Sequence, residues 1–134
     1  MSAVLIRAAL ETALAAMSPS LGTAWENTPY TPVQGAPYQR VHLMLAEPDN
    51  PEIGRMTRDH GFLQVSLAYP LGAGPAAAAT RAELIRDTFY RGRTFTASGL
   101  SVMIEKTPEI IPASTEPDRY VIIVRIRFFA NYQA

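Results

Sequence analysis

An α+β domain is the fold class that the sequence predicts, with a largely antiparallel sheet and two helices packed on one of its faces. Two segments place apolar residues at helical spacing, and several others alternate apolar and polar residues with a period of two. The length of 134 residues fits one domain, and a hydrophobic content of 48% is typical of a folded globular protein. No internal repeat or linker divides the chain, so we expect a single domain over residues 1–134.

The first predicted helix runs from Ala3 to Met17. Its apolar residues share one side at helical spacing: Ile6, Leu10, Ala13, Leu14 and Met17. Ser2 is a suitable N-cap, and Ser18-Pro19 ends the helix.

The second predicted helix follows the turn Leu71–Pro75, because proline fits the first helical turn. One side carries Ala78, Ala82, Ile85 and Phe89, with Leu84 beside them. We place Arg91 in its last turn and Gly92 at its left-handed cap.

Alternating segments predict the sheet. Tyr38–Leu45 and Gly61–Tyr69 read as antiparallel neighbours, and a long final strand, Tyr120–Ala130, is placed at the centre. Shorter strands are expected within Leu21–Glu26 and on both sides of the Ser98-Gly99 turn. Ala46–His60 and Thr107–Pro117 are rich in proline and polar residues, so both are predicted to be loops, and we expect Glu47–Asp59 to be mobile. The predicted shared core is Ile6, Leu10, Leu14, Ile85, Phe89, Ile122, Val124 and Ile126.

The segment from Trp25 to Val41 is unusually rich in aromatic residues and prolines. Prolines hold the backbone extended, and tyrosine and tryptophan combine an apolar body with a polar tip. Two interpretations remain open: an ordered crossover whose aromatics pack over the edge of the core, or an arm that contacts another protein.

Signals for catalysis, cofactors and metals are absent from the sequence. There is no cysteine, and His42 and His60 are too few and too far apart for a usual metal site. Gly72-Ala73-Gly74 precedes a helix but lacks the other residues of a phosphate-binding loop. We therefore expect no enzyme, no cofactor and no metal.

The charges are balanced, with twelve basic and twelve acidic residues. This balance argues against a free-standing nucleic-acid binder and is compatible with self-association. No apolar run reaches the about 18 residues that a membrane span needs, and the N-terminal segment reads as a helix of the mature protein.

Surface contacts are the remaining functional expectation. Arg125 and Arg127 share one face of the last strand, where Arg40 can join them, and this face is either a solvated sheet surface or a contact patch. The candidate interface residues are Trp25, Tyr30, Tyr38, Arg55, Arg58, Arg125 and Arg127.

Several short sequence segments, in their order along the chain, resemble those of the tail terminator proteins of long-tailed, lambda-like phages. They are Trp25–Pro32 after a leading helix, Pro37–Val41 entering a strand, Gly61–Leu67 followed by Pro70–Gly74, and the closing strand Tyr120–Phe129. The resemblance covers nearly the whole chain and implies a mixed sheet with helices on one face.

The same resemblance implies a structural protein of a phage or prophage tail. Such a protein forms a hexameric ring on the head-proximal end of the tail tube, stops tube polymerisation and offers the surface that the head joins. The implied partners are other copies of the chain, the tail tube protein and a head–tail connector, and the free chain can be monomeric until the ring forms on assembly. The implied location is the virion tail, and the host cytoplasm during assembly. Two alternatives are a head–tail connector or neck protein, and a non-viral α+β domain that binds a small ligand or a peptide.

Overall fold

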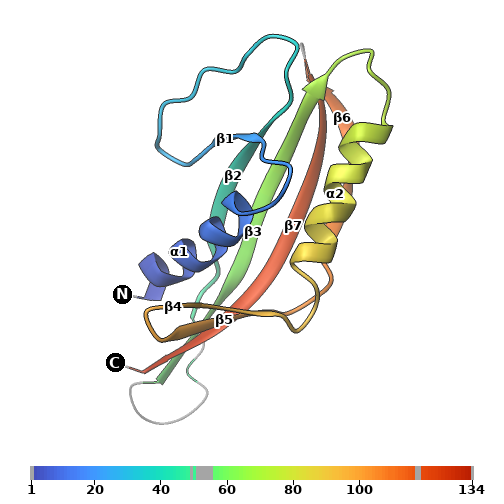
Figure 1. The fold of residues 1–134 in the computed structure, drawn as a ribbon. Coiled ribbons are helices and arrows are strands. Elements are labelled where there is room, and N and C mark those ends of the chain that lie inside the picture. Colours follow the sequence, from blue (N-terminus) through green and yellow to red (C-terminus); the bar gives the residue numbers. More distant parts are fainter. Residues whose placement is uncertain (1, 49, 51–55, 117–118, 134) are drawn as a thin grey trace.

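Two long antiparallel strands form the middle of the sheet in the computed structural model, which describes residues 2–48, 50, 56–116 and 119–133 (Figure 1). The elements in chain order are α1 (Ser2–Ala15), β1 (Gly22–Ala24), β2 (Tyr38–Leu45), β3 (Met56–Pro70), α2 (Ala76–Thr88), β4 (Thr94–Ala97), β5 (Leu100–Ile104), β6 (Glu109–Glu116) and β7 (Arg119–Gln133).

The sheet has the strand order β1-β2-β3-β7-β5-β4, and β6 also pairs with β7. β1 and β2 are parallel, whereas the other pairs are antiparallel. β3 and β7 pair over their whole length, from Met56 opposite Gln133 to Pro70 opposite Arg119. The mixed, largely antiparallel α+β fold is thus confirmed, and the last strand is central as predicted.

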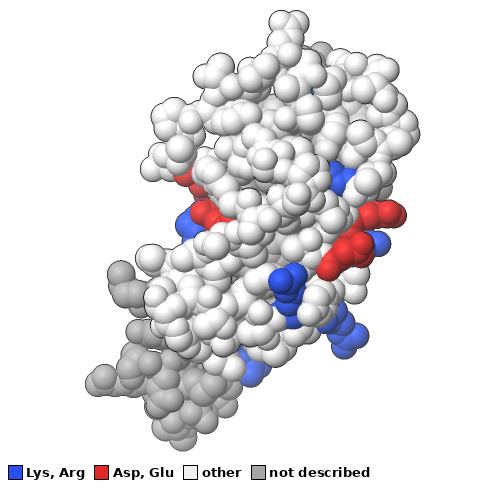
Figure 2. Space-filling view, in the orientation of Figure 1, with Lys and Arg blue, Asp and Glu red and all other residues white. Residues whose placement is uncertain are grey.

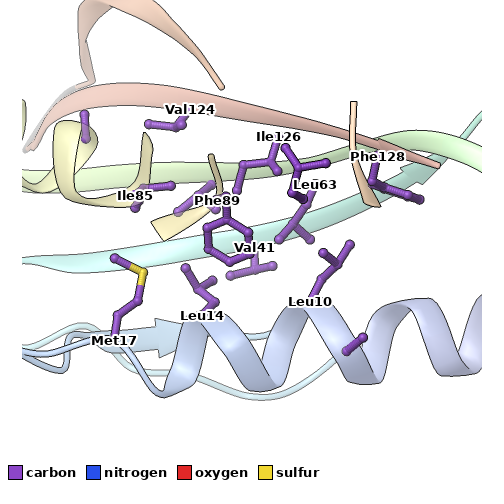
Figure 3. Close-up of a cluster of buried hydrophobic side chains, with 14 of the residues drawn as sticks. Leu10, Leu14, Met17, Val41, Leu63, Ile85, Phe89, Val124, Ile126 and Phe128 are labelled. Carbon is purple, nitrogen blue, oxygen red and sulfur yellow. The ribbon is translucent and has the colours of Figure 1, made fainter. Parts of the chain in front are cut away.

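Both helices lie against one face of the sheet, called here the inner face (Figure 1). Alternation along β3 and β7 turns Leu63, Val65, Val124 and Ile126 toward that face, where all four are fully buried. Figure 3 shows Leu10 and Leu14 of α1 pointing toward the sheet strands. All eight predicted core residues belong to this one cluster, which confirms the predicted core.

Two predicted loops are wrong in part. β3 begins at Met56, well before the predicted start at Gly61, because β7 extends to Gln133 and gives Met56–His60 a pairing partner. Glu109–Glu116 lies in the segment predicted as a loop, yet it forms β6 along β7, with an irregular register between Ile111 and Ser114. Of the expected mobile segment Glu47–Asp59, residues 49 and 51–55 lie outside the described residues.

The end of the second helix also differs from the prediction. α2 ends at Thr88, so Arg91 follows the helix, and Arg86 is the basic residue of its last turn. Gly92 does adopt a left-handed backbone conformation, with φ of 89°, but in the turn that leads to β4.

Candidate functional site

The crossover between β1 and β2, residues 25–37, is fastened to the sheet and is called here the arm. Trp25 is half-buried and packs against the core. The rings of Tyr30 and Tyr38 are stacked with their centroids 5.4 Å apart. A Cβ at Gly22 would lie 2.4 Å from the Tyr30 hydroxyl oxygen, so the absence of a side chain there lets the ring approach β1. These contacts agree with the first interpretation, in which the aromatics pack over the edge of the core, and they do not test contact with another protein.

Arg119 holds the arm at its far end, although the sequence reasoning did not single it out. Its side chain is buried, and Nη2 donates a hydrogen bond to the Val33 carbonyl oxygen at 2.9 Å. Nη1 donates to the Ala36 carbonyl oxygen, and the guanidinium lies 5.1 Å from the Tyr38 ring centroid. Alternation along the last strand was the available signal, because it places Arg119 on the same face as Arg125 and Arg127.

Replacing Arg119 with lysine is expected to loosen the arm while the core stays folded. A single ammonium cannot span two carbonyl oxygens as the planar guanidinium does. Each lost hydrogen bond to a charged group weakens the local structure by about 1.5–3 kcal/mol. The Ala36 amide, which donates to the Val33 carbonyl oxygen, should then exchange its hydrogen at least about tenfold faster. Arg127→Lys is the matched control, and equal Ala36 exchange rates in the two variants would contradict the assigned role of Arg119.

Beside the arm, the surface includes two segments that contain no charged residue. No charged residue occurs in 27–39 or in 61–80, and Figure 2 shows the corresponding upper part of this view almost free of charge. Val33 of the arm and Leu71 of the β3–α2 turn are 64% and 47% exposed. Between the arm and the β3–α2 turn lies a hollow of about 550 Å³ lined by Pro32, Gln34, Gly35, Pro70, Leu71 and Arg119. Such a preformed surface, with exposed apolar side chains and few charges, is suited to contact with another protein.

Glu26 connects the start of the arm to α1 and β2. Its Oε1 accepts hydrogen bonds from the Leu43 amide at 2.6 Å and from Arg7 Nη1 at 3.0 Å, while His42 Nδ1 lies 3.5 Å from Oε2. Desolvation by burial acts to raise the pKa of Glu26. The Leu43 amide, Arg7 and His42 outweigh it, so the pKa lies below its ordinary value of 4.5.

The lowered pKa predicts a stability loss in acid that depends on Glu26. A carboxyl whose pKa is lower in the folded than in the unfolded state stabilises the fold above its unfolded pKa, and this contribution is lost as the pH falls through the folded pKa. Glu26→Gln should therefore be less stable than wild type at neutral pH, and the difference should shrink as the pH falls below about 4.5. Urea denaturation across this range measures it. The exposed Glu83→Gln is the control, and a constant wild-type advantage down to pH 2 would contradict the assignment.

A second group of candidate residues lies on the outer face of the sheet, opposite the helices. The Cζ atoms of Arg125 and Arg127 lie 5.2 and 5.8 Å from the Phe62 ring centroid, and Arg125 Nε donates to Gln64 Oε1 at 3.1 Å. Arg58 Cζ lies 5.5 Å from the Phe129 ring centroid, and its Nε donates to Asn131 Oδ1. Each guanidinium thus lies within cation–π distance of a phenylalanine ring on this face.

The structure thus gathers the candidate residues into two groups. Trp25, Tyr30 and Tyr38 belong to the arm, and Arg58, Arg125 and Arg127 belong to the outer face. Arg40 also lies on the outer face. It pairs with Ser66, which pairs with Ile123, and Ile123 is on the same side of β7 as Arg125 two residues later. Arg55 lies outside the described residues.

Over the described ranges, 2–48, 50, 56–116 and 119–133, no cluster of three or more histidine and carboxylate side chains could hold a metal ion. Within those same ranges, neither helix is long and apolar enough to cross a membrane.

Comparison with known proteins gives the family. No curated protein sequence matches the chain. Six chains of solved structures match it. One of them aligns with a TM-score of 0.79 and 26% identity, over 100% of this chain and 99% of the other. The family described as "Phage tail terminator protein" matches residues 5–128, which is most of the chain. The chain belongs to the phage tail terminator protein family and is a component of the phage tail.

Proposed function

We propose that this protein caps the head-proximal end of the tail tube as a hexameric ring, stops tube polymerisation and offers the surface that a head–tail connector joins. The observation that carries the proposal is the family match over residues 5–128. The fold is compatible with it, because the described residues form a sheet with the arm at one edge and an outer face that the helices leave open.

The arm is the part that we assign to the tube end. Its exposed Val33 and the neighbouring Leu71 offer apolar contacts. The hydrogen bonds from Arg119 to the Val33 and Ala36 carbonyl oxygens hold the arm in place before binding. A surface that is already ordered loses little conformational entropy on binding. Another apolar protein surface is therefore the partner that the arm fits.

The test measures tube length. Tail tube protein is polymerised with and without the purified chain, and the tubes are measured by electron microscopy. We expect shorter tubes that carry added density at one end. Unchanged lengths and bare ends would overturn the proposed function.

Two valine variants test the arm within the same assay. Val33→Asp places a charge in the uncharged segment 27–39. Val4→Asp places the same charge on α1, at a position that is similarly exposed, 60% against 64% for Val33. Both variants should fold, because substitutions at exposed sites change stability little. Loss of capping with Val33→Asp alone would support contact between the arm and the tube end. Equal capping by both variants would exclude that contact.

A further inference from the structure

The outer face carries two guanidiniums that form no ion pair with a carboxylate of the described residues. Arg127 is exposed and Arg125 half-buried, and both rest on Phe62. Glu109 is the register partner of Arg125, and the Glu105 amide donates to the Arg127 carbonyl oxygen, but neither carboxylate forms an ion pair with these guanidiniums. Both cations can therefore accept a carboxylate from outside the molecule.

On the other side of the sheet, α2 carries two carboxylates that also form no ion pair within the described residues. These are Glu83 and Asp87, which are exposed and one turn apart. The intervening Arg86 instead donates its Nε proton to the Pro108 carbonyl oxygen. Figure 2 shows acidic side chains gathered on the α2 side of the helical face.

The two pairs match in spacing. Residues i and i+2 on a strand lie about 6.8 Å apart, and residues i and i+4 on a helix lie about 6 Å apart along the axis. The two carboxylates of one copy can thus meet the two guanidiniums of another at the same time. The formal net charge of zero adds no general repulsion between copies.

We propose that the Arg125/Arg127 pair of one copy binds the Glu83/Asp87 pair of a second copy, and that this contact builds the ring. The two pairs lie on opposite sides of the sheet, so one neighbour cannot engage both, and the contact must repeat head to tail. A head-to-tail contact closes into a ring when its rotation permits. The ring rests on the function proposed above, whereas the pairing between copies stands on the charges and spacing alone.

Charge reversal tests the pairing because the two sides can be exchanged separately. One variant carries Arg125→Glu with Arg127→Glu, and the other carries Glu83→Arg with Asp87→Arg. Each variant alone should associate at least about tenfold more weakly than wild type, since it presents like charges at every contact. A mixture of the two should assemble again, because alternating copies restore opposite charges at each contact. A chain with all four changes should assemble alone.

Association is measured by analytical ultracentrifugation and native mass spectrometry at low salt, and on tube ends by electron microscopy. Wild-type assembly should weaken at 1 M salt, where charges are screened beyond about 3 Å. Circular dichroism and melting confirm that each variant folds.

Three outcomes overturn the pairing. In the first, the mixture fails to assemble although both variants fold. In the second, only the arginine variant is impaired in assembly, which would indicate that the outer face binds an acidic protein surface or nucleic acid. In the third, the wild type remains monomeric both in concentrated low-salt solution and on tubes. The proposed function is judged separately, because tube length still reports capping when the pairing fails, and rings that leave tubes uncapped would refute the function alone.

Discussion

Replacing Phe89 with alanine should lower the free energy of unfolding by about 3–5 kcal/mol. Phe89 is completely buried at the C-cap of α2, and its ring centroid lies 5.2 Å from that of Phe95 at a tilt of 44°. Figure 3 shows the ring next to Leu14 of α1 and the strand residues Val41 and Leu63. Truncation therefore opens a cavity where both helices meet the sheet.

The neighbouring Tyr90 is the matched control, because it is an aromatic side chain with 54% exposure. Tyr90→Ala should change stability by no more than about 0.5 kcal/mol. Chemical denaturation of both variants gives the comparison. A loss below about 1 kcal/mol for Phe89→Ala would mean that the site is not closely packed.

Alternation and helical spacing predicted the parts of the fold that bury one regular face. Tyr38–Leu45 was predicted with the bounds that β2 has, because inward Gln39 and Val41 alternate with outward Arg40 and His42. The α2 side with Ala78, Ala82, Ile85 and Phe89 was also predicted, and all four residues are fully buried. In such segments the local pattern and the tertiary packing agree.

Polarity misled the prediction where pairing with a distant strand decides the structure. Thr57, Arg58 and Asp59 read as loop residues, yet the extra length of β7 supplies them with backbone partners. Pro112 similarly argued against a strand in 109–116, but β6 tolerates it where the register between Ile111 and Ser114 is irregular. A single sequence does not reveal which segment will pair with such residues.

The candidate site was predictable as a set of residues but not as an arrangement. The tyrosines of the arm and the arginines of the last strand were recognised from their types and spacing. The hydrogen bonds from Arg119 to Val33 and Ala36 join residues more than 80 positions apart, so local pattern could not show them. Buried Arg81, which donates to the Pro19 carbonyl oxygen, was missed for the same reason.

Gly61 shows how one small residue lets β2 and β3 approach, and substituting it should separate them. The residue pairs with Leu45 on one side and Phe128 on the other. A Cβ there would lie 2.1 Å from the Met44 carbonyl oxygen and 3.0 Å from the Leu45 Cα. Both are backbone atoms, so no change of rotamer can relieve the clash, and one of the strands must shift.

Gly61→Ala is therefore expected to destabilise the fold by about 1–3 kcal/mol, and Gly61→Val by more, because overpacking forces the backbone to move. Amide chemical shifts should change most at Met44 and Leu45, whereas those of α2 stay close to wild type. Gly72→Ala is the control, since a Cβ there meets no atom within 4 Å and only its φ of 81° causes strain. Denaturation midpoints compare the variants. If Gly61→Ala loses no more stability than Gly72→Ala, and the Met44 and Leu45 shifts are unchanged, then the close approach of the two strands is not what requires glycine at this position.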